Sequence, residues 1–194
     1  NFYRYIFVSI VIWSMSIATN IFIIPKNILA IDRVATFPIF GITQGFLPIA
    51  GFNYGAKNWQ RVRMVINISI IFASILASLV FILIFIFSNF IPGIFSNEAK
   101  VCSDTPVALR YVFMALPIIG IQLIGAAYFQ AIGKALPALL LTLSRQGLFF
   151  IPLLFTLPKY YGLIGVWMAF PLSDLLSTLV TAYFLNRAVR KELT

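Results

Sequence analysis

The chain has 194 residues, of which 61% are hydrophobic and only 10% are charged, and its mean hydropathy is +1.01. Soluble domains carry about 25% charged residues, so this composition excludes a soluble fold and predicts an all-α integral membrane protein. The absence of His and the single Cys exclude a His-dependent base, a His metal site and an internal disulfide. We expect no enzyme activity, no cofactor and no nucleic-acid partner, because the net charge of +9 suits loops that face anionic lipid.

Charges and helix breakers divide the chain into six apolar stretches. A membrane-spanning helix needs about 20 residues, and six transmembrane helices are predicted at residues 5–24, 28–50, 59–91, 107–132, 138–157 and 163–186. Together they predict a single six-helix unit over residues 1–194. Because the chain starts with Asn and no signal peptide precedes the first apolar stretch, we interpret it as part of a longer protein.

The distribution of basic residues predicts the orientation in the membrane. One side of the six-helix arrangement holds both chain ends with Arg4, Lys57, Arg61, Arg63, Lys134, Arg187, Arg190 and Lys191. The other side holds Lys26, Arg33, Lys100, Arg110 and Lys159. Since Lys and Arg concentrate on the cytoplasmic side, we expect a multi-pass protein of the plasma (inner) membrane with both ends of this segment in the cytoplasm.

Asp174 is the most informative residue, because it lies halfway along the last predicted helix. A mid-membrane Asp costs about 2.5 to 3.5 kcal/mol on insertion scales. It belongs to a polar stripe at helical spacing, formed by Ser173, Asp174, Ser177, Thr178 and Thr181. We expect this stripe to face the bundle interior, where Asp174 either contacts a proton, a cation or a cationic substrate or serves as a structural carboxylate.

Arg145 in the fifth predicted helix is the candidate partner of Asp174. At 1.5 Å per residue their depths differ by roughly 9 Å, so the Arg side chain either bridges part of that gap or snorkels to the membrane surface. The adjacent pair Asp32 and Arg33 is interpreted as interfacial, and Cys102 as a bystander in a loop.

Two further helices carry candidate residues. Residues 107–132 present Gln122, Gly125, Ala126, Phe129 and Gln130 on one face, which favours close helix packing and leaves a substrate-lining role open for Gln122. Residues 28–50 contain Pro38, Gly41, Gln44, Gly45 and Pro48. The prolines and the small-xxx-small pair predict either a hinge or a static kink.

Four segments resemble the signatures of one transporter family, in the same order. They are PIFGITQGFLPIAGFNYGAKNWQRV (38–62), YFQAIGKA (128–135), SRQ (144–146) and GLIGVWMAFPLSD (162–174). The family is that of the multidrug and toxic compound extrusion (MATE) transporters. The resemblance implies twelve helices in two lobes around a central cavity, with this chain as the C-terminal lobe.

The resemblance also implies a function. It is the export of amphipathic, often cationic compounds, driven by inward H⁺ or Na⁺, with the bilayer and a missing N-terminal lobe as partners. Some branches place coupling carboxylates in the helices that match 5–24 and 107–132, but both lack an interior acid here. The second helix also looks about one turn short after Arg33. Coupling would therefore depend on the other lobe or on Asp174.

The expected mechanism is alternating access of two lobes. In this lobe the pathway would be lined by Gln44, Gln122, Ser177, Thr178 and the pair of Asp174 with Arg145. Pro38 and Pro48 would let their helix flex. The alternatives are a lipid-linked oligosaccharide flippase of the same superfamily, a membrane fragment without transport activity, and an intramembrane enzyme, which the lack of His and of paired acids disfavours.

Overall fold

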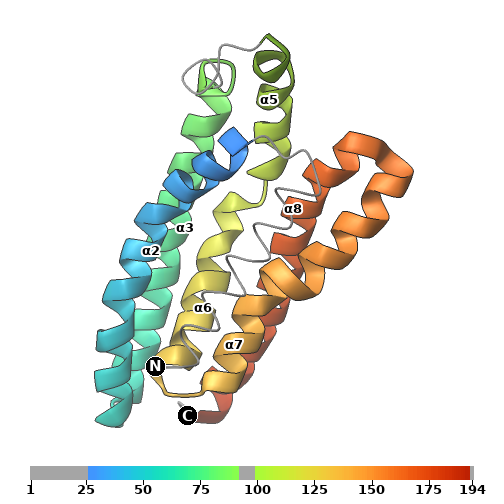
Figure 1. The fold of residues 1–194 in the computed structure, drawn as a ribbon. Helices are drawn as coiled ribbons and strands as arrows, with labels where there is room; N and C mark the ends of the chain where they lie inside the picture. Colours follow the sequence, from blue (N-terminus) through green and yellow to red (C-terminus); the bar gives the residue numbers. More distant parts are fainter. Residues whose placement is uncertain (1–25, 92–98, 193–194) are drawn as a thin grey trace.

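The computed structural model describes residues 26–91 and 99–192, and every element in these two stretches is helical. The helices stand side by side in one bundle (Figure 1). In chain order they are α2 (Lys26–Gly55), α3 (Trp59–Phe87), α5 (Ala99–Val112), η1 (Leu116–Ile118), α6 (Ile119–Ala131), α7 (Ala135–Leu143), η2 (Ser144–Phe149) and α8 (Phe150–Glu192). The first predicted helix, residues 5–24, lies outside the described residues.

Helices α2 and α3 form a hairpin with a short, locally encoded turn. Lys57 takes a positive φ of 56°, and the Asn58 side chain caps α3 by accepting a hydrogen bond from the Arg61 backbone N–H at 3.4 Å. The rings of Tyr54 and Trp59 meet edge to face across the turn at 5.3 Å. α2 therefore continues to Gly55, past its predicted end.

The predicted helix 107–132 is not continuous in the structure. It is divided into α5 and α6, with the short 3₁₀ turn η1 between them. Pro117 lies in this turn. A proline has no N–H to donate, and its ring disfavours helical geometry in the preceding residue, which accounts for the break at this position.

Helix α6 is the centre of the bundle. Nine of its thirteen residues are buried, and it packs against α2, α3, α7 and α8. Small residues make this possible, because a methyl group on Gly120 would lie 2.9 Å from the Ser74 backbone nitrogen in α3. The face of this helix that was predicted to pack closely therefore does contact its neighbours, although Gln130 at the end of the face is exposed.

Helix α8 is two helices joined by a reversal. Gly162 has φ 56° and ψ −135°, a conformation open almost only to glycine, and there the chain folds back on itself (Figure 1). We call residues 150–161 the proximal arm and residues 163–192 the distal arm. They pack closely, since a methyl group on Gly165 would lie 2.5 Å from the Leu157 carbonyl oxygen.

The described residues contain four helical stretches that are long and apolar enough to cross a membrane: Ile31–Gly55, Trp59–Phe87, Thr105–Ala131 and Ala135–Lys191. The last has 57 residues, or about 86 Å of helix, against a hydrocarbon core of about 30 Å. The reversal at Gly162 resolves this excess of length. The described part of the chain is thus all-helical, with helices long and apolar enough to span a membrane, but it does not confirm the predicted count of six helices.

Candidate functional site

A buried ion pair is the main polar feature of the bundle interior. Arg145 Nε donates a hydrogen bond to Asp174 Oδ1 at 2.6 Å. The two side chains are only 16% and 7% exposed. Of the two orientations open for Arg145, the structure adopts the one that bridges to Asp174, and the side chain does not snorkel.

Arg145 reaches its partner from an irregular turn. It lies in η2, a π-helix that interrupts the predicted regular helix. A π-turn inserts one extra residue into the helix and rotates the residues that follow it. The depth difference of roughly 9 Å assumed a regular rise of 1.5 Å per residue, and that assumption fails at this turn.

The polar stripe around Asp174 faces the interior, as predicted. Its five members are at most 5% exposed, whereas Leu175, Leu176 and Leu179 on the other side of the distal arm are exposed. Its hydroxyls mostly bond back to their own helix, as Ser177 does to the Asp174 carbonyl oxygen at 3.1 Å. The stripe therefore supplies a polar wall with one carboxylate in it.

Two buried polar atoms near this wall meet no hydrogen-bond partner among the described residues. They are Thr178 Oγ1 in the stripe and Gln122 Oε1 in α6. Gln122 uses its amide nitrogen for a long bond of 3.4 Å to the Leu141 carbonyl oxygen. α6 and the distal arm run toward the same end of the bundle (Figure 1). One turn further along, Gly125 lies against Thr181, so Gln122 and Thr178 lie at similar levels.

Gly125 sets the distance between α6 and the distal arm. A methyl group on Gly125 would lie 2.4 Å from Thr181 Cγ2 and 3.7 Å from Leu185 Cδ2. We expect Gly125→Leu to destabilise the full-length protein by about 1 to 3 kcal/mol, the usual cost of overpacking, measured as a lower Tm in detergent.

Gly45→Leu is the matched control for Gly125→Leu. Among the residues that the structure describes, a methyl group on Gly45 would meet no atom within 4 Å, and glycine is a poorer helix former than an alkyl residue. We expect its Tm to equal or exceed that of the wild type. Equal losses of Tm in both variants would contradict the assigned role of Gly125.

The candidate residues of α2 do not join this interior site. The exposed residues include all five candidates, Pro38, Gly41, Gln44, Gly45 and Pro48. A methyl group on Gly41 would also meet no atom of the described residues within 4 Å. α2 stays helical through both prolines. Within the described residues, the small-xxx-small pair contacts no other helix, and Gln44 lies on an open face.

Asp32, which the sequence suggested to be interfacial together with Arg33, also lies near the ion pair. It is half-buried and close enough to Arg145 and Asp174 to interact electrostatically with both, whereas Arg33 is exposed. Helical periodicity could have indicated that Asp32 faces the interior, because it shares a helix face with the buried residues Thr36 and Thr43. Two carboxylates therefore share the field of one guanidinium.

The described residues contain no group of three or more His, Cys, Asp or Glu side chains that could hold a metal ion. The polar interior instead offers carboxylates, a guanidinium, an amide and hydroxyls. Such groups bind and release ions and polar substrates.

Comparison with known proteins identifies the family. The family model MatE matches residues 5–156. The chain belongs to the MATE family. In the MATE multidrug transporter DinF-BH, solved as a complex with a ligand, 35% of aligned residues are identical, with a TM-score of 0.77 over 84% of this chain and 36% of that one. A second MATE structure, in complex with MaD3S, has 20% identity and a TM-score of 0.84 over 95% of this chain and 43% of that one, and it supports the fold alone.

Curated MATE relatives are named multidrug export protein MepA, which makes them transporters and not enzymes. The protein from Staphylococcus saprophyticus is 26% identical over 69% of this chain, and that from Staphylococcus haemolyticus is 24% identical over 84%. These alignments cover 30% and 36% of the two relatives. The chain thus spans about a third of the length of the curated relatives it matches.

Proposed function

We propose that this chain is the C-terminal six-helix lobe of a cation-coupled antiporter that exports amphipathic and cationic drugs by alternating access. The observation that carries the proposal is the buried pair of Arg145 and Asp174 within the polar stripe. Intramembrane ionisable residues are costly and typically mark ion or substrate pathways. Membership of the MATE family and relatives named as drug exporters support the direction of transport.

The charges of the site suit a cation switch. With Asp32, Asp174 and Arg145 ionised, the cluster carries a net charge of −1. This charge favours binding of a proton, Na⁺ or a cationic substrate. A cation that binds Asp174 competes with Arg145 for the same carboxylate. Releasing Arg145 changes the contact between η2 and the distal arm, and a ligand that prefers one arrangement shifts the population toward it.

Polar groups on two faces would line the pathway. Gln122, Ser177 and Thr178 face the interior, where the unpaired atoms of Gln122 and Thr178 are suited to bind a polar ligand. Gln44 lies on the open face of α2 and would reach a substrate only in a cavity completed by the other lobe. Pro38 and Pro48 would let this helix flex between the two states.

The proposed setting is the plasma (inner) membrane, with both ends of this segment in the cytoplasm. The support is the excess of Lys and Arg on that side. Neither a cofactor nor a bound metal is part of the proposal, and the coupling ion is H⁺ or Na⁺.

The test is ethidium efflux from drug-sensitive cells that express the full-length reading frame, with Na⁺ and pH varied separately. We expect efflux that follows one of the two ion gradients, which would name the coupling ion. A vector-only strain and a protein-level measurement in the membrane fraction are the controls. Absence of efflux from a correctly inserted protein would contradict the proposal and favour an oligosaccharide flippase or a membrane protein without transport.

A further inference from the structure

We propose that a hollow at the C-terminal end of α8 binds the phosphate headgroup of an anionic phospholipid. The hollow has a volume of about 650 Å³ and is lined, among the described residues, by Ala182, Tyr183, Asn186, Arg187, Arg190 and Lys191. This volume is in the range of about 300–1,000 Å³ typical of small-ligand sites. The inference is independent of the transport activity proposed above.

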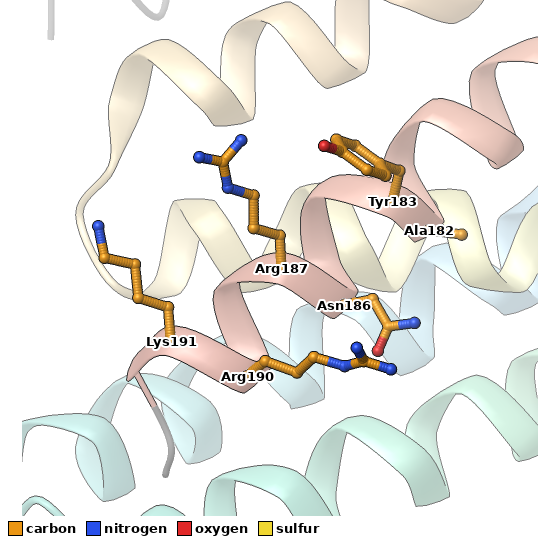
Figure 2. Close-up of a pocket in the computed structure, with 6 residues that line it drawn as sticks. All are labelled: Ala182, Tyr183, Asn186, Arg187, Arg190 and Lys191. Carbon is orange, nitrogen blue, oxygen red and sulfur yellow. The ribbon is translucent and has the colours of Figure 1, made fainter.

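The lining residues have the chemistry of a phosphate site. Three of the six are cations, one is an amide, one is a phenol, and none is a carboxylate. Arg187 and Lys191 extend from the same side of the helix and are the pair assigned to the phosphate, whereas Asn186 and Arg190 extend from the other side (Figure 2). Guanidinium groups bind phosphate through two parallel hydrogen bonds, and an ammonium adds a compact positive charge.

The position of the hollow indicates a lipid and not a free anion. Just before the hollow and at its start, the distal arm exposes Leu179, Tyr183 and Phe184, and the next turn exposes Asn186 and Arg187. This change from apolar to basic along one helix is typical of the boundary between acyl chains and headgroups, where Tyr is also enriched. A phospholipid contacts both zones at once, whereas inorganic phosphate contacts only the basic one.

A purely local role for the cations is the competing explanation. Basic side chains in the last turn of a helix interact favourably with the helix dipole, and this needs no ligand. If the cations served only the helix dipole, the hollow would not bind one lipid headgroup in preference to another. The two explanations therefore differ in whether anionic lipid is bound selectively.

The experiment is native mass spectrometry of the purified full-length protein in neutral detergent. Phosphatidylglycerol, phosphatidylcholine and inorganic phosphate are titrated separately. We expect retained phosphatidylglycerol on the wild type. In the variant Arg187→Gln with Lys191→Gln we expect roughly 25-fold weaker retention, taking about fivefold for each cation lost near a membrane surface. The control is Lys57→Gln with Arg61→Gln, two exposed cations at the turn between α2 and α3.

Several outcomes would overturn the proposal. An equal loss of phosphatidylglycerol retention in both double variants would show that general surface charge attracts the lipid. Retention of phosphatidylcholine as strong as that of phosphatidylglycerol would show that the site does not select a headgroup. Binding of inorganic phosphate as tightly as lipid would mean a free-anion site. If the double variant does not fold, Lys191→Gln alone, in the exposed last turn, should still lose about fivefold, and unchanged retention there would reject the site.

Discussion

Replacing Arg145 by Met is expected to lower the free energy of unfolding of the full-length transporter by about 3 kcal/mol. Breaking a buried ion pair by removing one partner usually costs about 3–5 kcal/mol, because the remaining charge stays buried. We expect the lower end of this range, because the side chains of Arg145 and Asp174 are 16% and 7% exposed and keep some contact with solvent. For an unfolding unit of 194 residues the effect is a fall in Tm of roughly 6–12 °C, and in the longer full-length protein, measured by thermal unfolding in detergent, the fall should be smaller.

Arg110→Met is the matched control for Arg145→Met. Arg110 is exposed, donates a hydrogen bond to Ser88 Oγ at 3.2 Å and lies over the Phe85 ring at 5.1 Å. Its loss should cost about 1 kcal/mol or less. The double variant Arg145→Met with Asp174→Leu should recover much of the stability, because an apolar pair can replace a buried ionic one. Equal Tm values for the two Arg variants would show that the ion pair does not stabilise the fold.

Asp174→Asn is expected to reduce ethidium efflux per transporter by at least roughly fivefold, the lower bound of a typical coupling free energy between two sites. Asn keeps the size of the side chain and an oxygen that can accept the hydrogen bond from Arg145. It loses the negative charge and the ability to bind a proton. Any remaining efflux should therefore lose its dependence on the coupling ion, which is measured by repeating the assay across pH and Na⁺.

Thr43→Val provides the control for this substitution. Thr43 is another buried polar side chain, and its hydroxyl bonds to the Ile39 carbonyl oxygen of its own helix at 3.0 Å. The change is isosteric and leaves every charge in place, so efflux should stay near the wild-type rate. An Asp174→Asn protein that exports ethidium at the normal rate with the normal ion dependence would remove Asp174 from the mechanism.

Sequence reasoning recovered those features that depend on composition and regular periodicity. Apolar length predicted the membrane helices, and the spacing from Ser173 to Thr181 predicted a buried polar stripe, because a regular helix places such residues on one face. The family was recognised from the four segments 38–62, 128–135, 144–146 and 162–174.

Irregular backbone explains most of what sequence reasoning missed. The π-turn at Arg145 and the break before Pro117 each change the register, and no regular helical pattern contains them. Sequence reasoning did not connect Asp32 with the ion pair, because its neighbour Arg33 suggested a surface pair, while the buried Thr residues on its own face were the better signal. The direction of Gln44 depends on which faces of α2 are covered, and that is decided by tertiary packing.

The reversal at Gly162 also bears on how the chain enters the membrane. Arg145 and Asp174 are 29 residues apart, one before the reversal and one after it, so a single helical hairpin brings them together. Each charge alone would cost about 2.5 to 3.5 kcal/mol to insert. A hairpin that partitions from the translocon as one unit presents lipid with a neutral pair instead. We therefore expect the contact that is proposed to switch during transport also to help the nascent hairpin, with its two buried charges, integrate into the membrane.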